Sequence, residues 1–306
     1  MTVPTAPTPP TRLTASDFDP EDLRLFDQYV HGGLSRRGFL DAAGRGTAAG
    51  TMTAAGLLAA LSPRFADAQQ VAPQDARLKS GYVEVPSPQG YGRLRGYLVE
   101  AVQGAARRPT VLVVHENRGL NPHIEDIARR LALDGFIAFA PDGLFPLGGY
   151  PGDEDKARAL FPQLDQAKSR EDFVTAAQHL QALPAGNGKV GVVGFCYGGS
   201  IANFLATRMP ELAGAVPFYG SQPTPADAAR IKSPLLIHYA GIDERINAGA
   251  ARYEAALKAV GVPHEAFVYE GTQHGFNNDT TPRYEEAAAK LAWQRTVAFF
   301  RRTLAG

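Results

Sequence analysis

The residue with the clearest chemical potential is Cys196, the single cysteine of this 306-residue chain. It stands in the segment Gly194-Phe195-Cys196-Tyr197-Gly198-Gly199, after the β-branched run 189–193 and before the helix-like stretch 200–206. Glycines around a central residue let a strand and a helix meet in a tight turn without Cβ clashes. Such a turn presents the central side chain as a nucleophile, although a lone cysteine can also be a small buried hydrophobic residue.

Two residues later in the chain could serve as the acid and the base beside this nucleophile, in the order nucleophile, acid, base. Asp243 follows the apolar run 234–239, and Glu244 beside it is the alternative acid. His274 follows the strand-like run 264–269. Loops after parallel strands meet at the carboxyl edge of a sheet. There, His274 would take the thiol proton and return one to the leaving group, while the carboxylate would hold the imidazole in the required tautomer.

The elements that must position these residues alternate between strand and helix from residue 81 onward. The first two expected strands are consecutive and would be antiparallel neighbours, whereas the others form strand–helix units. This pattern predicts an α/β fold with an open, mostly parallel sheet and helices on both faces. The expected strands are 82–85, 93–99, 110–114, 136–140, 190–194, 214–219, 234–239 and 264–269, and the expected helices are 124–133, 156–164, 170–183, 200–208, 248–260 and 283–303.

The turn around Cys196, the Gly-Ile-Asp segment 241–243 and the Gln-His-Gly-Phe segment 273–276 together resemble the dienelactone hydrolase family. The likeness runs from about Gly81 to the C-terminus. It implies an α/β-hydrolase fold that hydrolyses enol-lactones and related esters without a cofactor. It also implies that Cys196, Asp243 and His274 form the catalytic triad and that the reaction passes through a thioester acyl-enzyme.

The same resemblance assigns roles to the segment after the strand 110–114. Glu116 takes the position of a family glutamate that contacts the resting thiol and helps to activate it; the alternative is that Glu116 caps a loop or pairs with Arg118. The fold further implies an oxyanion hole made by the backbone N–H groups of Tyr197 and Asn117.

Substrate preference is expected to differ from the family pattern. The family binds the substrate carboxylate with arginines, one of them four residues after the catalytic histidine, where this chain has Asn278. An amide lacks the charge-assisted fork that holds a carboxylate. Arg118 or Arg158 could compensate, but each could equally be a surface or ion-paired residue. We therefore expect neutral esters or lactones to be better substrates than the carboxylated dienelactone.

No metal site is expected, because His115-Glu116 and His123 lack the spacing that places two histidines on successive helical turns. The zero net charge and the lack of a basic stripe argue against nucleic-acid binding. The expected partner is a small ester or lactone. Two other functions stay open: a broad carboxylesterase for neutral esters, and a binding or redox-thiol protein on a hydrolase scaffold.

The N-terminal part has a different composition. We expect a disordered extension over 1–34, a twin-arginine signal over 35–68, a linker over 69–80 and the catalytic domain over 81–306. The signal rests on Arg36 and Arg37 before Phe39 and Leu40, a weakly apolar run 47–61 and the Ala-Asp-Ala pattern at 66–68. It predicts export by the twin-arginine machinery to the periplasm. The alternative is an amphipathic helix with a chance arginine pair.

Overall fold

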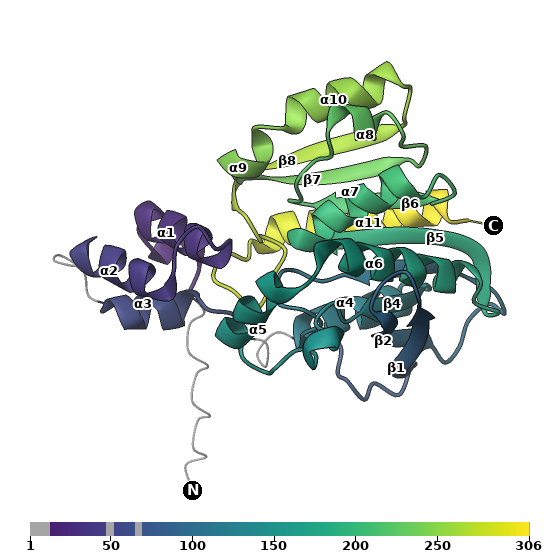
Figure 1. Cartoon of the computed structure of the whole chain (residues 1–306), viewed down its shortest axis with the longest axis horizontal. Coiled ribbons are helices and arrows are strands. Elements are labelled where there is room, and N and C mark those ends of the chain that lie inside the picture. Colours follow the sequence, from purple (N-terminus) through teal and green to yellow (C-terminus); the bar gives the residue numbers. More distant parts are fainter. Residues whose placement is uncertain (1–12, 47–51, 65–68, 306) are drawn as a thin grey trace, which may run out of the picture.

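The computed structural model describes residues 13–46, 52–64 and 69–305, and its centre is one eight-stranded sheet. The strand order is β1-β2-β4-β3-β5-β6-β7-β8, with antiparallel pairing only at β1–β2 and β2–β4. This sheet, flanked by helices, is the predicted α/β-hydrolase architecture (Figure 1). The strands are β1 (Leu78–Ser87), β2 (Gly92–Ala101), β3 (Arg108–Val114), β4 (Ile137–Pro141), β5 (Gly186–Phe195), β6 (Gly214–Phe218), β7 (Leu235–Ile242) and β8 (His264–Gln273).

Helices cover both faces of the sheet, and the central strands are apolar on both sides for that reason. In β3, Val111 and Val113 pack into one core with α4 and α11, while Leu112 and Val114 pack into the other with α6, α7 and α10. The helices of this part are α4 (Pro122–Leu133), α5 (Glu154–Leu160), α6 (Gln166–Gln181), α7 (Tyr197–Arg208), α8 (Pro225–Ala228), α9 (Glu244–Asn247), α10 (Ala250–Ala259) and α11 (Glu286–Thr303).

Some helices and strands begin or end at other residues than expected, because strand pairing extends them or a proline ends them. The expected strands 82–85 and 93–99 are each longer, because β1 and β2 pair without interruption from Leu78↔Ala101 to Ser87↔Gly92. The expected helix 156–164 ends at Leu160 and continues as one 3₁₀ turn, Phe161–Gln163, in which Pro162 removes a backbone donor.

The N-terminal segment is folded, contrary to the expectation of disorder up to residue 34. Asp19 caps α1 (Pro20–Val30), and α2 (Arg36–Gly46) and α3 (Ala54–Leu61) follow. The three helices share a hydrophobic cluster of their own, which includes Phe26 and Phe39. We call the described residues 13–46 and 52–64 the N-terminal segment. Residues 1–12 of the expected extension lie outside the described residues.

This segment lies at the end of the sheet where β7 leads into α9, and it is also next to α5 (Figure 1). Arg36 and Arg37, the expected export pair, are exposed on α2, and Arg36 forms an ion pair with Asp155. The Ala-Asp-Ala pattern at 66–68 and part of the apolar run 47–61 fall outside the described residues. Within the described ranges, none of the helices is long and apolar enough to span a membrane.

Candidate active site

Cys196 lies in the turn that the sequence predicts, between the end of β5 and the start of α7. Its φ of 55° and ψ of −111° are unfavourable for a residue with a side chain, so the surrounding packing must hold it there. Two glycines make this packing possible. A Cβ on Gly194 would lie 1.9 Å from the carbonyl oxygen of Gly198, and a Cβ on Gly198 would lie 2.2 Å from that of Val114.

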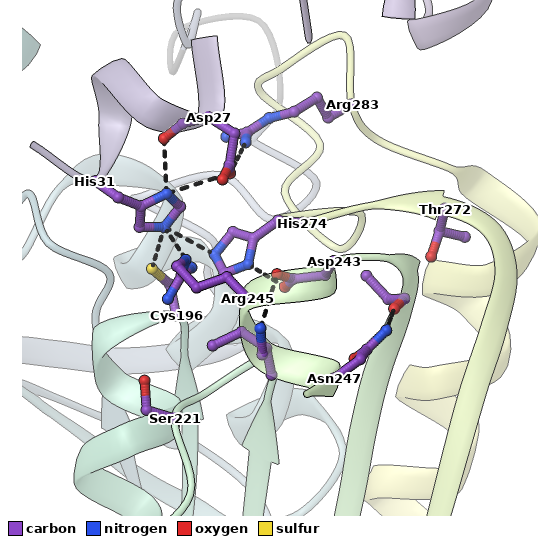
Figure 2. Close-up of polar contacts among 12 residues, drawn as sticks. Asp27, His31, Cys196, Ser221, Asp243, Arg245, Asn247, Thr272, His274 and Arg283 are labelled. Carbon is purple, nitrogen blue, oxygen red and sulfur yellow. Dashed lines mark hydrogen bonds and ion pairs between the residues drawn. The ribbon is translucent and has the colours of Figure 1, made fainter. Parts of the chain in front are cut away.

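The acid and the histidine meet as expected from their positions after neighbouring strands. Asp243 directly follows β7, His274 directly follows β8, and His274 Nδ1 donates to Asp243 Oδ2 at 2.5 Å (Figure 2). Both side chains are buried, whereas Glu244, the alternative acid, is exposed on α9. A carboxylate that accepts from Nδ1 leaves His274 Nε2 for proton exchange with the thiol.

A second histidine, His31, contacts the same atoms from the end of α1. Its Nε2 lies 3.5 Å from Cys196 Sγ and 3.3 Å from His274 Nε2 (Figure 2). Its Nδ1 donates to the carbonyl oxygen of Asp27 at 2.8 Å and lies 3.2 Å from the Asp27 carboxylate. The sequence interpretation missed His31, because it placed this residue in a disordered extension.

A helical signal was nevertheless present in this part of the sequence. Asp19-Pro20 is a helix start, and Leu23, Phe26 and Val30 recur at helical spacing, so that they bury one face of α1. Because α1 ends at Val30, its burial places His31 at the site.

The two imidazoles change the electrostatics of the thiol. Burial opposes its ionisation, but the positive charges of His274 and His31 outweigh burial and lower the pKa of Cys196 to about 5. Burial likewise opposes protonation of His31, but the Cys196 thiolate and Asp27 raise its pKa to about 10. The pKa of His274 is also raised against its burial, by the Cys196 thiolate and by Asp243. A positive charge on either imidazole thus favours the thiolate form of Cys196.

The structure also places the residues expected to activate the thiol and to form the oxyanion hole. Glu116 lines a small cavity with Cys196, and Asn278 Nδ2 donates to Glu116 Oε2 at 2.8 Å. Asn117 lines the same cavity, and its side-chain amide donates to the carbonyl oxygen of Val30 at 3.0 Å. Tyr197 is the first residue of α7, so its backbone N–H is one of the free donors of that helix.

The two arginines considered for carboxylate binding are already engaged. Arg118 is buried, and its Nε lies 3.1 Å from a carboxylate oxygen of Glu154. Arg158 covers the ring of Tyr29 at 3.9 Å and donates to its carbonyl oxygen. Arg283 also lines the cavity, and its Nη1 lies 3.5 Å from Oδ1 of Asp27.

Cys196 lines two cavities. The first has a volume of about 30 Å³ and is walled on one side by Phe26 and Tyr29 of the N-terminal segment. The second has a volume of about 220 Å³ and is lined by Tyr219 and Arg245, among others. The N-terminal segment therefore forms part of the wall around the thiol.

Three other histidines have partners away from the thiol. His115 is buried, and its Nε2 accepts from the backbone N–H of Gly143 at 2.9 Å. His123 Nδ1 lies 3.0 Å from Asp279, and buried His238 contacts Thr296 and Tyr269. His115 and His123 thus have different hydrogen-bond and ion-pair partners, and the two side chains do not form a common ligand site.

Comparisons with known proteins match both parts of the chain. The model of the dienelactone hydrolase family matches residues 94–304, and a second model, described as YqhI-like, matches residues 10–48. A hydrolase fragment named YghX from Escherichia coli K12 is 53% identical over 109 residues, which are 36% of this chain and 93% of that protein.

Two other relatives cover most of the hydrolase part. A candidate carboxymethylenebutenolidase from Escherichia coli O157:H7 is 32% identical over 244 residues, which are 75% of this chain and 89% of the relative. A crystal structure of a candidate dienelactone hydrolase from Klebsiella pneumoniae has a TM-score of 0.66 and 30% identity, and covers 74% of this chain and 99% of that one. With its eight-stranded sheet, its Cys196 turn and these matches, the chain belongs to the dienelactone hydrolase family.

Proposed function

We propose that this hydrolase cleaves carboxylic esters or lactones with Cys196 as the nucleophile, His274 as the acid–base and Asp243 as its orienting carboxylate. The observation that carries the proposal is the buried hydrogen bond between His274 Nδ1 and Asp243, which directs the other imidazole nitrogen to the thiol side. The lowered pKa of Cys196 supports it, because a thiolate is the reactive form.

The reaction would proceed in two steps. The Cys196 thiolate attacks the ester carbonyl carbon, the bond to the alkoxy oxygen breaks, and His274 gives that oxygen a proton, which leaves a thioester. Water then gives a proton to His274 and attacks the thioester, so that the acid and the thiolate are released. The backbone N–H groups of Tyr197 and Asn117 would stabilise the oxyanion in both steps. Where Cys196 carries its proton, at low pH, Glu116, held by Asn278, would accept that proton.

The test is mass spectrometry with an activated ester, combined with steady-state kinetics in the presence of a chelator. We expect an acyl mass shift on Cys196, and a loss of kcat/KM on the order of 10⁴-fold or more in Cys196→Ala and in His274→Ala. The double variant should be no worse than either single variant, because the two groups act as a unit. His264→Ala, which changes a half-buried histidine away from the site, is the control.

Full turnover by Cys196→Ala would refute the cysteine mechanism. Absence of both an acyl adduct and hydrolysis in the wild type would favour the other class of function, a binding or redox-thiol protein on this scaffold.

For the substrate, we propose neutral esters or lactones rather than carboxylated dienelactones. The cavity arginines Arg118 and Arg283 already face Glu154 and Asp27, so an incoming carboxylate would compete with carboxylates of the protein. We expect the kcat/KM ratio of a carboxylated dienelactone to a neutral ester with a similar leaving group to be near or below unity. A ratio that strongly favours the dienelactone and collapses in Arg118→Ala or Arg158→Ala would show that a relocated arginine binds the carboxylate.

A further inference from the structure

Three good metal-ligand atoms converge at the thiol: His31 Nε2, His274 Nε2 and Cys196 Sγ. All three atoms lie within 4.8 Å of one another. The two nitrogens are 3.3 Å apart, and His31 Nε2 is 3.5 Å from the sulfur (Figure 2). Hydrolysis by a cysteine triad requires one histidine at the thiol, so the second one neither attacks the substrate nor transfers a proton in the mechanism proposed above.

The two separations that involve His31 Nε2 match those between ligands of a tetrahedral zinc ion. Zinc lies at about 2.0–2.1 Å from histidine nitrogen and about 2.3 Å from cysteine sulfur, so at the tetrahedral angle two nitrogens are roughly 3.3 Å apart and a nitrogen and a sulfur roughly 3.6 Å apart. The separations of 3.3 Å between the two nitrogens and 3.5 Å between His31 Nε2 and the sulfur agree with these values. His31 Nε2 is thus at ligand distance from both other atoms, while Cys196 Sγ and His274 Nε2 lie within 4.8 Å of each other and would close on the ion.

Each histidine also has a hydrogen-bond acceptor at its Nδ1, as histidine ligands of metal ions usually do. His274 Nδ1 donates to Asp243, and His31 Nδ1 faces the carbonyl oxygen and the carboxylate of Asp27. A histidine whose Nδ1–H is held in this way presents the Nε2 lone pair and is a more basic ligand. Two Nε2 lone pairs that face each other at 3.3 Å repel unless a proton or a cation lies between them.

We propose that Cys196, His31 and His274 bind a divalent ion of the zinc class, with an open fourth position for water. Thiolate and imidazole ligands select zinc over magnesium or calcium. Arg245 Nη2, 3.1 Å from His31 Nε2, must move aside, which it can do because its side chain is exposed. The sequence showed no metal spacing, because the ligands come from α1, the β5–α7 turn and the loop after β8.

The ion would hold the hydrolase in an inactive form. Its bonds use the sulfur lone pair that attacks the ester and the imidazole lone pair that takes the proton. Binding releases the protons that these ligand atoms carry and needs no oxidant or reductant. This consequence rests on the proposed function, but binding itself does not.

The experiment uses the full chain after chelator treatment and titrates it with Co²⁺ and Zn²⁺. We expect one ion per chain and a thiolate-to-cobalt charge-transfer band that is absent in Cys196→Ser. Asp27→Asn, which changes a group behind His31, should lower the affinity about 10–100-fold. His31→Gln removes a ligand and should lower the affinity further. His264→Gln is the matched control and should bind as the wild type does. A cobalt spectrum without the thiolate band, or equal affinity in wild type and His31→Gln, would overturn the proposal.

A second measurement on the wild type needs no variant. One equivalent of Zn²⁺ should stop iodoacetamide alkylation of Cys196 and inhibit ester hydrolysis, and a chelator should restore both. Alkylation that is indifferent to Zn²⁺, or hydrolysis that Zn²⁺ stimulates, would contradict the proposal. Suppose that the metal-free protein hydrolyses no ester but develops the thiolate–cobalt band when Co²⁺ is added. That result would refute only the proposed function.

Discussion

At the residue scale, the charge of Cys196 depends on two imidazoles rather than one. Because its pKa is lowered to about 5, the thiolate persists above that pH and is lost as the pH falls through it. We expect the rate of iodoacetamide alkylation of metal-free protein to have a midpoint at about pH 5. In His31→Gln the midpoint should rise by roughly 1–3 pH units, because one favourable charge is removed.

Mass spectrometry of the alkylated protein measures this profile, with His264→Gln as the control. A wild-type midpoint in the ordinary thiol range, at about pH 8.5, would show that the imidazole charges do not act on Cys196.

Also at the residue scale, the nucleophile turn depends on the absence of a side chain at position 198. A Cβ there would lie 2.2 Å from a backbone oxygen of β3, which cannot move aside without disturbing the sheet. We expect Gly198→Ala to lower the free energy of unfolding by about 1–3 kcal/mol or more. Gly81→Ala makes the same chemical change on β1 where no atom lies within 4 Å of the new Cβ. Urea denaturation of the two variants should differ, and equal midpoints would refute the clash.

At the scale of elements, the position of α1 depends on a few contacts. Phe26 is 2% exposed and packs among the N-terminal helices, while the Arg283 guanidinium lies 5.3 Å from its ring. We expect Phe26→Ala to weaken this packing by about 3–5 kcal/mol. Hydrogen exchange at the amides of α1 should then be faster.

The sheet should be unaffected by this change, because it has hydrophobic cores of its own. Arg24→Ala is the control, since that side chain is exposed and forms an ion pair with Glu21 on the surface of the same helix. Unchanged exchange in α1 of Phe26→Ala would mean that the cluster does not hold this helix.

At the scale of the whole molecule, we propose export by the twin-arginine route. Replacement of Arg36 and Arg37 by lysine should keep the protein in the cytoplasm, because the receptor reads the arginine pair rather than charge alone. Arg45→Lys, on the same helix, is the control. Cell fractionation measures the outcome, and normal export of the double lysine variant would refute the proposal.

Processing has a structural consequence at the same scale. Cleavage after residue 68 would remove α1, α2 and α3, and with them His31 and one wall of the smaller cavity. The intact mass of the exported protein therefore shows whether the site keeps its second histidine.

The sequence by itself determined the features that local geometry controls. The glycines around Cys196 predict a tight turn, because a side chain at those positions would clash with the backbone. The apolar runs before Asp243 and His274 predict the strands that end just before these residues. Parallel strands end at one edge, so the meeting of these residues followed from chain order alone.

The tertiary structure determined which side chains reach the site from elements that are distant in the chain. Asp243 rather than Glu244 faces His274, because β7 turns into α9 with Glu244 on its exposed side. Arg283 and His31 reach the site only because the loop after β8 and the end of α1 pack there. The residues beside them do not specify that position. His31 is brought in by the packing of the N-terminal helices through Phe26 and its neighbours, and the Arg283 guanidinium lies 5.3 Å from the Phe26 ring.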